Sequence, residues 1–151
     1  MKPLPPDLQL DNQLCFKLYA ASRAVTRAYK PMLETLGLTY PQYLVMLVLW
    51  EWHTCPPAQP TVKALGERLQ LDSGTLTPLL KRLQQLELVE RRRSTHDERE
   101  VHLGLTAEGS ALSGKVAPLK AQLFCASDAD LHALVDLRGR LDQLLERLAG
   151  E

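Results

Sequence analysis

The sequence lacks the features of a secreted or membrane-embedded chain. Its longest apolar run, Tyr43–Trp50, is far shorter than the roughly 20 residues that a membrane-spanning helix needs. The opening Met-Lys-Pro-Leu-Pro-Pro contains no apolar core of a signal peptide. We therefore expect a cytoplasmic protein with no membrane partner.

The sequence also lacks paired cysteines and metal-ligand spacings. Cys15, Cys55 and Cys125 are widely spaced and form no Cys-x-x-Cys pair, so neither a disulfide framework nor a zinc site is predicted. The four histidines show no metal-ligand spacing either. We expect no metal and no cofactor, and any cysteine function should be redox chemistry.

Net charge is absent as well, because 18 Lys and Arg offset 18 Asp and Glu. The composition of the whole chain therefore gives no sign of a nucleic-acid partner. Between Lys81 and Arg99, however, six basic residues against four acidic ones leave a local charge of +2. Any case for DNA binding must rest on this part of the chain.

The length of 151 residues and the 45% hydrophobic content fit a single globular domain, residues 1–151. Apolar residues recur every three or four positions over residues 11–37, which predicts a long helix with Asp11 as N-cap and Gly37 as its stop. A second helix is predicted to start near Thr39, and its apolar block indicates that it lies in the core.

The middle of the chain has the pattern of a winged helix-turn-helix. Two short helices follow a proline-rich loop, the first capped by Thr61 and the second by Asp72 or Ser73. Residues 88–91 and 101–105 then alternate apolar and polar side chains around a polar tip, as in a β-hairpin. The predicted fold class is therefore mainly α with a small β-hairpin that forms the wing.

Two more helices are predicted after the hairpin, one starting at Thr106 and one near residues 127–130, which match capping-box spacing. Leucines in the last helix alternate by three and four, which suits a single-chain core or a coiled-coil-like contact. Helix-turn-helix proteins usually bind two half-sites as dimers. We accordingly assign residues 11–37 and 107–149 to helical dimerisation and 38–106 to DNA binding.

Polar residues of the second short helix lie off its leucine stripe. Its first turn offers free N–H groups and short side chains, which permit close approach to phosphates or bases. Hydroxyls bond either group, and cations contact phosphate or guanine, although a solvated helix face has the same composition. The candidates are Ser73, Thr75, Thr77, Lys81 and Arg82.

Arg91, Arg93 and Arg99 flank the tip of the predicted hairpin. An arginine on a wing can enter a narrow minor groove, where the negative potential is enhanced. A solvated charged hairpin is the alternative. The helices and the basic hairpin occur in the order that a DNA-binding winged helix requires.

The wing and the helix after it resemble the MarR family of transcriptional regulators. The matching motifs are Asp97-Glu-Arg99, Leu105-Thr106, Gly109 and the recognition-helix sequence of residues 71–83. The order of helices matches over essentially the whole chain. The resemblance implies that Arg99 reaches the minor groove and that Asp97 orients the wing arginines. We expect a homodimer that binds a pseudo-palindromic operator in double-stranded DNA.

Cys15 lies about one turn inside the first predicted helix, where the positive end of the dipole favours a thiolate, the form that attacks peroxides. Tyr19 follows at i+4 on the same face, and all four tyrosines lie within 25 residues. Phenolic hydroxyls can donate hydrogen bonds to a thiolate. On the residues alone, an inert buried cysteine among packing tyrosines is the favoured interpretation.

Residues 11–16, 38–51 and 124–127 resemble the OhrR branch of the MarR family, the organic-hydroperoxide sensors, and this reverses that preference. The resemblance implies that Cys15 reacts with the peroxide and that Tyr29 and Tyr40 bond it.

The resemblance also covers a second cysteine near the start of the last helix, which Cys125 matches. In that branch this cysteine resolves the sulfenic acid as an intersubunit disulfide. Cys55 matches no family site and is interpreted as a loop cysteine without function.

The sequence thus predicts a redox-sensing repressor that leaves its operator when an organic hydroperoxide oxidises Cys15. One alternative is a repressor of the same fold that a small phenolic ligand releases, with Cys15 incidental. The other is a thiol peroxidase, for which the helix-turn-helix and wing would have no purpose. We expect that the protein is not an enzyme.

Overall fold

The computed structural model describes residues 2–125 and 130–150, apart from the side chains of Phe124 and Cys125. The chain forms two compact units, residues 1–117 and 118–151. In chain order the elements are the short 3-10 turns η1 (Pro6–Leu8) and η2 (Leu10–Asn12), then α1 (Leu14–Leu36), α2 (Tyr40–Thr54), α3 (Val62–Leu69), α4 (Ser73–Gln85), β1 (Val89–Arg93), β2 (Val101–Leu105), α5 (Ala107–Cys125) and α6 (Leu131–Ala149). The predicted fold class, mainly α with one hairpin, is confirmed.

Helix α2 forms the centre of the first unit, where it packs against α1, α3, α4 and β2. Tyr43, Val45, Met46, Val48 and Leu49 on this helix are all 4% exposed or less. Full burial of one such side chain stabilises the fold by roughly 1.5–3 kcal/mol. The prediction that the apolar block lies in the core is confirmed.

The two helices of the helix-turn-helix begin at side-chain caps. The Thr61 hydroxyl accepts a hydrogen bond from Ala64 N at 3.1 Å, and Asp72 Oδ1 accepts one from Thr75 N at 2.7 Å. The backbone N–H of Thr75 therefore lowers the pKa of Asp72, which keeps this cap charged at neutral pH. Of the two predicted caps for α4, the structure selects Asp72.

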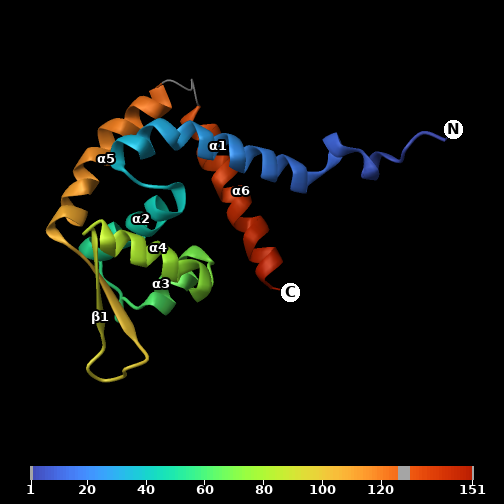
Figure 1. Cartoon of the computed structure of the whole chain (residues 1–151). Helices are drawn as coiled ribbons and strands as arrows, with labels where there is room; N and C mark the ends of the chain where they lie inside the picture. Colours follow the sequence, from blue (N-terminus) through green and yellow to red (C-terminus); the bar gives the residue numbers. More distant parts are fainter. Residues whose placement is uncertain (1, 126–129, 151) are drawn as a thin grey trace. The chain divides into compact units, whose positions relative to one another are not determined.

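Helices α3 and α4 are joined by a tight turn in which Gln70 adopts a left-handed conformation, with φ of 56°. The hairpin follows α4 and is antiparallel, with Val89 opposite Leu105 and Arg93 opposite Val101. The first strand was predicted over residues 88–91, whereas in the structure the pairing begins at Val89 and continues to Arg93. Figure 1 shows the hairpin projecting beyond α3 and α4 as an arm.

The N-terminus of α1 differs from the prediction. Asp11 lies in η2, and the N-cap is Gln13. The preceding turns are held by their own polar side chains, since Asn12 Nδ2 donates to Pro6 O at 2.8 Å and Gln13 Nε2 donates to Asp7 O at 2.7 Å. Cys15 is consequently the second residue of the helix. The predicted stop at Gly37 is confirmed, with φ of 70°.

The end of α5, predicted at about Phe124, is confirmed, but the start of α6 differs from the prediction. Cys125 is the last residue of α5 and does not begin the final helix. Helix α6 is capped by Asp130, whose Oδ1 accepts a hydrogen bond from His132 N at 3.0 Å. Ser127, the first residue of the expected capping box, lies outside the described residues.

The leucine stripe of α6 is not buried by the single chain. Leu134, Leu137 and Leu148 are 38%, 52% and 62% exposed, and α6 contains no buried residue. At the other end of the chain, Leu14 and Val25 of α1 are 60% and 48% exposed. These surfaces are available for contact with a second subunit.

No single helix among the described residues is long and apolar enough to cross a membrane, although α1 and α2 taken together, bent by 71°, pass a test of length and composition.

Candidate DNA-binding surface and thiol site

The predicted DNA-reading residues of α4 share its solvent-facing side. Ser73, Thr75, Thr77, Lys81 and Arg82 are all exposed, whereas Leu76, Leu80 and Leu83 are buried. The Thr77 hydroxyl donates to Ser73 O at 2.8 Å, which leaves its oxygen free to accept. Helix α4 thus presents hydroxyls near its start and cations near its end.

Three wing arginines keep their charge available. Arg91, Arg93 and Arg99 are exposed, and no carboxylate among the described residues lies within 4.0 Å of their nitrogens. Arg92, by contrast, is paired with Glu90 at 3.0 Å. Unneutralised cations on a projecting hairpin suit contact with nucleic-acid phosphates.

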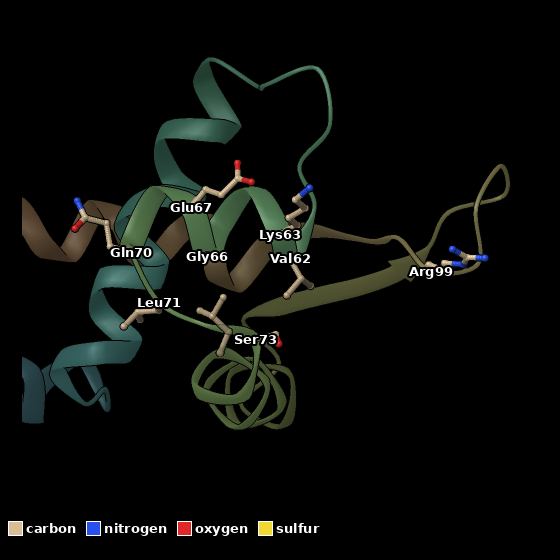
Figure 2. Close-up of a pocket in the computed structure, with 9 residues that line it drawn as sticks. Val62, Lys63, Gly66, Glu67, Gln70, Leu71, Ser73 and Arg99 are labelled. Atoms are coloured by element: carbon tan, nitrogen blue, oxygen red, sulfur yellow. The ribbon is translucent and has the colours of Figure 1, made fainter. Parts of the chain in front are cut away.

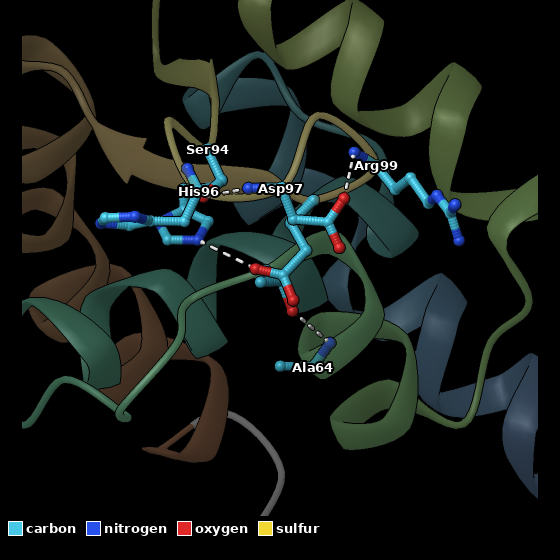
Figure 3. Close-up of polar contacts among 8 residues, drawn as sticks. Ala64, Ser94, His96, Asp97 and Arg99 are labelled. Carbon is cyan, nitrogen blue, oxygen red and sulfur yellow. Dashed lines mark hydrogen bonds and ion pairs between the residues drawn. The ribbon is translucent and has the colours of Figure 1, made fainter.

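Side-chain hydrogen bonds fix the wing to α4 and shape its tip. Arg91 Nε donates to Gln84 Oε1 at 3.0 Å, which links β1 to α4. At the tip, the Ser94 hydroxyl accepts from Asp97 N at 3.4 Å, and Asp97 Oδ1 accepts from Arg99 N at 3.0 Å (Figure 3). Asp97 therefore contacts the Arg99 backbone, and its carboxylate positions the tip rather than the guanidinium.

The surface between α3, α4 and the wing is hollowed. One cavity of about 490 Å³ has Lys63, Ser73 and Arg99 among its lining residues (Figure 2). Another of about 520 Å³ is lined by residues that include Lys63, Thr77, Arg91 and Arg99. Cations from α3 and from the wing therefore face the same concave region as the α4 hydroxyls.

Sequence reasoning missed Lys63 and Gln84. The predicted DNA contacts lay only on α4 and the wing, so Lys63 on α3 was not among them. The sequence signal for Lys63 was its place two residues after the Thr61 cap, in the first turn of α3. No sequence signal would have found Gln84, because its bond to Arg91 depends on how the strand packs against α4.

Cys15 is exposed in the first turn of α1. Tyr19 is 63% exposed, and the guanidinium of Arg23 lies 5.5 Å from its ring centroid. Tyr19 has no ring contact with another tyrosine among the described residues. Tyr19 is therefore separate from the cluster that the other three tyrosines form.

Tyr29, Tyr40 and Tyr43 form a cluster with ring centroids 5.7–6.4 Å apart. Desolvation by burial, with smaller effects of Tyr29 and Tyr40, raises the pKa of Tyr43 to about 12, and burial raises the pKa of Tyr29. Both hydroxyls therefore remain protonated donors at neutral pH. Tyr43 was not a predicted site residue, although its spacing of three from Tyr40 on one helix was a signal.

Cys15 and the tyrosine cluster are far apart within one chain. Cys15 and Tyr29 both lie on α1, fourteen residues apart. At 1.5 Å per residue, the separation along the helix axis is about 21 Å. The ring centroid of Tyr40 lies 5.7 Å from that of Tyr29, so Tyr40 lies near the same end of α1. One subunit alone cannot form the predicted bonds between Cys15 and these hydroxyls.

The other two cysteines lie at the C-terminal ends of α2 and α5. Cys55 is exposed and caps the C-terminal end of α2. The side chain of Cys125 lies outside the described residues. Among the residues that the structure describes, no group of three His, Cys, Asp or Glu side chains is arranged to hold a metal ion.

Comparison with known proteins identifies the family. The family described as transcriptional regulator SarA/Rot matches residues 27–116. The organic hydroperoxide resistance transcriptional regulator of Bacillus subtilis (strain 168) is 48% identical over 141 residues, which cover 93% of this chain and 92% of that protein.

Solved structures of the Staphylococcus epidermidis protein AbfR share the fold. The reduced form bound to DNA is 34% identical, with a TM-score of 0.71 over 95% of this chain and 96% of that one. The disulfide form is 36% identical, with a TM-score of 0.60 over 92% and 94%.

These relatives regulate transcription, which confirms the prediction that the chain is not an enzyme and removes the thiol-peroxidase alternative. The identity of 48% over nearly the whole chain, together with the winged helix-turn-helix, fixes the family. The chain belongs to the MarR family of DNA-binding transcriptional regulators and, within it, is of the OhrR type.

Proposed function

We propose that this protein is a cytoplasmic repressor that binds operator DNA as a homodimer and leaves it when an organic hydroperoxide oxidises Cys15. The observation that carries the proposal is an exposed thiol in the first turn of α1, in a chain 48% identical to a regulator of organic hydroperoxide resistance. The first turn of a helix stabilises a thiolate, which is the peroxide-reactive form.

The exposed apolar stripes support a homodimer. Residues 11–37 and 107–149 supply the dimerisation helices in this proposal, and residues 38–106 supply the DNA-binding region. The α6 leucines and the N-terminal part of α1 lack cover within the chain, and a second copy would bury them. Two recognition helices related by a two-fold axis then read a pseudo-palindrome.

A dimer also explains how Cys15 can be bonded by tyrosines that lie far from it within its own chain. Because about 21 Å of helix separates Cys15 from Tyr29 within a chain, the thiolate is proposed to receive its hydrogen bonds from Tyr29 and Tyr40 of the partner subunit. Tyr19, one turn after Cys15 on the same helix, lies close enough in sequence to support the thiolate from its own subunit.

Oxidation proceeds in two chemical steps in this proposal. The Cys15 thiolate attacks the terminal oxygen of the hydroperoxide, the O–O bond breaks, and an alkoxide leaves and takes a proton from water. The Cys125 thiol of the partner subunit then attacks the sulfenic acid, forming a disulfide and releasing water. A disulfide tolerates Cα separations of only about 4.4–6.8 Å, so closing it moves the backbone wherever the reduced cysteines are farther apart.

The release step follows from this movement. Winged domains that shift relative to one another no longer match two half-sites on DNA, and affinity falls. The solved reduced AbfR is bound to DNA, and a disulfide form of the same protein also exists, which supports the scheme.

The test is a titration of the reduced protein, bound to a duplex selected from a random library, with cumene hydroperoxide. We expect release to track the loss of two free thiols per subunit, Cys15 and Cys125, and to be reversed by a thiol reductant, measured by fluorescence anisotropy and thiol counting. Release by a phenolic ligand with all thiols intact would instead support the ligand-responsive alternative.

Mixed dimers provide a second prediction. A Cys15→Ser subunit paired with a Tyr40→Phe subunit retains one intact thiol–tyrosine site if the contact crosses the interface. We expect the mixed dimer to oxidise at the wild-type rate at one site per dimer. The Tyr40→Phe homodimer should be at least about tenfold slower, because a hydrogen bond to a charged group contributes roughly 1.5 kcal/mol or more. Differently tagged subunits and stopped-flow thiol oxidation measure this.

A mixed dimer as slow as the Tyr40→Phe homodimer would place the thiol and the tyrosines in one subunit, contrary to the proposal.

A third prediction concerns the wing. Arg99→Ala should weaken operator binding by at least about 1 kcal/mol without loss of the dimer, because it removes an unpaired cation from an exposed hairpin. Arg92→Ala is the matched control, since Arg92 is already neutralised by Glu90. Anisotropy and light scattering measure affinity and dimer mass. Unchanged affinity for Arg99→Ala would mean that the wing is only scaffold.

A further inference from the structure

Lys63 occupies a position on α3 that the proposed DNA-reading set does not use. Its side chain is exposed and has no carboxylate within 4.0 Å among the described residues. It lines both cavities of the concave surface, together with Ser73 in one, Thr77 in the other and Arg99 in both. Lys63 therefore faces the space between the recognition helix and the wing.

The cavity of about 520 Å³ has a cationic wall. Lys63, Arg91 and Arg99 line it, with the Thr77 hydroxyl and the Gln59 amide as further hydrogen-bonding groups. The carboxylate on this wall is Glu100, which lies 3.7 Å from His102 Nε2. Three like charges around one space repel each other unless an anion lies between them.

A carboxylate of α3 also borders the concave region. Glu67 lines the cavity of about 490 Å³ and lies four residues after Lys63. At that spacing the two side chains can pair on a helix, yet no Lys63–Glu67 ion pair within 4.0 Å forms in the structure. The charge of Lys63 remains available to a ligand.

We propose that this cavity seats a backbone phosphate of the bound DNA, contacted by Lys63 from α3. The inference rests on the proposed function, since it requires that the protein binds DNA through α4 and the wing. In a helix-turn-helix the first helix crosses the backbone, and lysine binds phosphate as a point charge. The contact therefore carries no sequence information and sets the position of the wing against the duplex.

The test compares Lys63→Gln with wild type on the library-selected operator and on a scrambled duplex, over a series of KCl concentrations. Loss of one phosphate contact makes the slope of log affinity against log salt less steep by about 0.9. If the two proteins bind equally at about 1 M salt, the affinity of the variant at about 0.1 M is then roughly eightfold lower than that of wild type. We expect the same loss for both duplexes, because a phosphate contact is independent of sequence.

Two variants control the experiment. Lys63→Arg keeps the charge and should retain the wild-type slope, and Lys2→Gln removes an exposed lysine outside the dimerisation and DNA-binding segments and should change nothing. Unchanged thermal unfolding of Lys63→Gln shows that the fold survives. An unchanged slope, or a loss confined to the operator, overturns the inference. Wild-type protein that binds neither duplex would contradict the proposed function instead.

Discussion

Replacing Cys15 by serine is expected to leave the operator affinity of the reduced protein unchanged and to abolish its release by organic hydroperoxide. Cys15 is exposed at the start of α1, so losing its sulfur removes no core packing. A serine hydroxyl is not oxidised by peroxides, so the first chemical step cannot occur. Anisotropy measures release, and mass spectrometry measures oxidation at position 15.

The other two cysteines serve as controls for this series. Cys125→Ser should form the sulfenic acid at Cys15 but no crosslinked dimer on a non-reducing gel, because the proposed resolving thiol is missing. Cys55→Ser should behave as wild type, since Cys55 lies at the C-terminal end of α2 and has no part in the proposed chemistry. A peroxide response that survives in Cys15→Ser would end the redox proposal.

Local chemistry explains why the winged helix-turn-helix could be predicted from the sequence. The caps Thr61 and Asp72 act on residues three positions away, and the leucine stripe of α4 repeats at helical spacing. Signals of such short range are readable in any sequence. The apolar and polar pattern of the hairpin is equally local, so its existence was predicted. The extent of β1 was misjudged, and in the structure Val89 is buried while the four residues after it are exposed.

Longer-range packing explains the errors. Asp11 has the right chemistry for an N-cap, but Asn12 and Gln13 bond back to the Pro6 and Asp7 carbonyls and hold two 3-10 turns in its place. Helical spacing puts Tyr19 on the face of Cys15, but it cannot show that Tyr43 joins Tyr29 and Tyr40 instead. Which rings meet depends on how α1 packs against α2.

The family motif that ends in Gly109 has a physical cause that only the structure supplies. Thr106 caps α5 by accepting a hydrogen bond from Gly109 N at 3.0 Å, and its hydroxyl donates to Glu87 O at 2.6 Å. Thr106 N donates to Leu88 O at 3.1 Å, and Trp50 Nε1 donates to Gly109 O at 2.8 Å. The first turn of α5 is thereby held with its backbone against the end of α4.

Gly109→Ala is expected to destabilise the protein by at least about 2 kcal/mol, because overpacking a buried site typically costs 1–3 kcal/mol and here the obstacle is backbone. An added Cβ would overlap the Leu88 carbonyl oxygen and would lie 3.3 Å from a methyl carbon of Leu105. A carbonyl in the turn after α4 cannot swing aside as a flexible side chain would. Relief requires α5 to move away, which strains the Thr106 and Trp50 bonds.

Gly114→Ala on the same helix is the matched control. Nothing lies within 4 Å of a Cβ at Gly114, so the substitution should stabilise the helix by up to about 1 kcal/mol through propensity alone. Urea unfolding at one fixed protein concentration, followed by circular dichroism, compares the variants, since the stability of a dimer depends on concentration. If both alanines raise the unfolding midpoint, the junction tolerates a side chain, and the backbone contact at Gly109 is not what holds α5 against the end of α4.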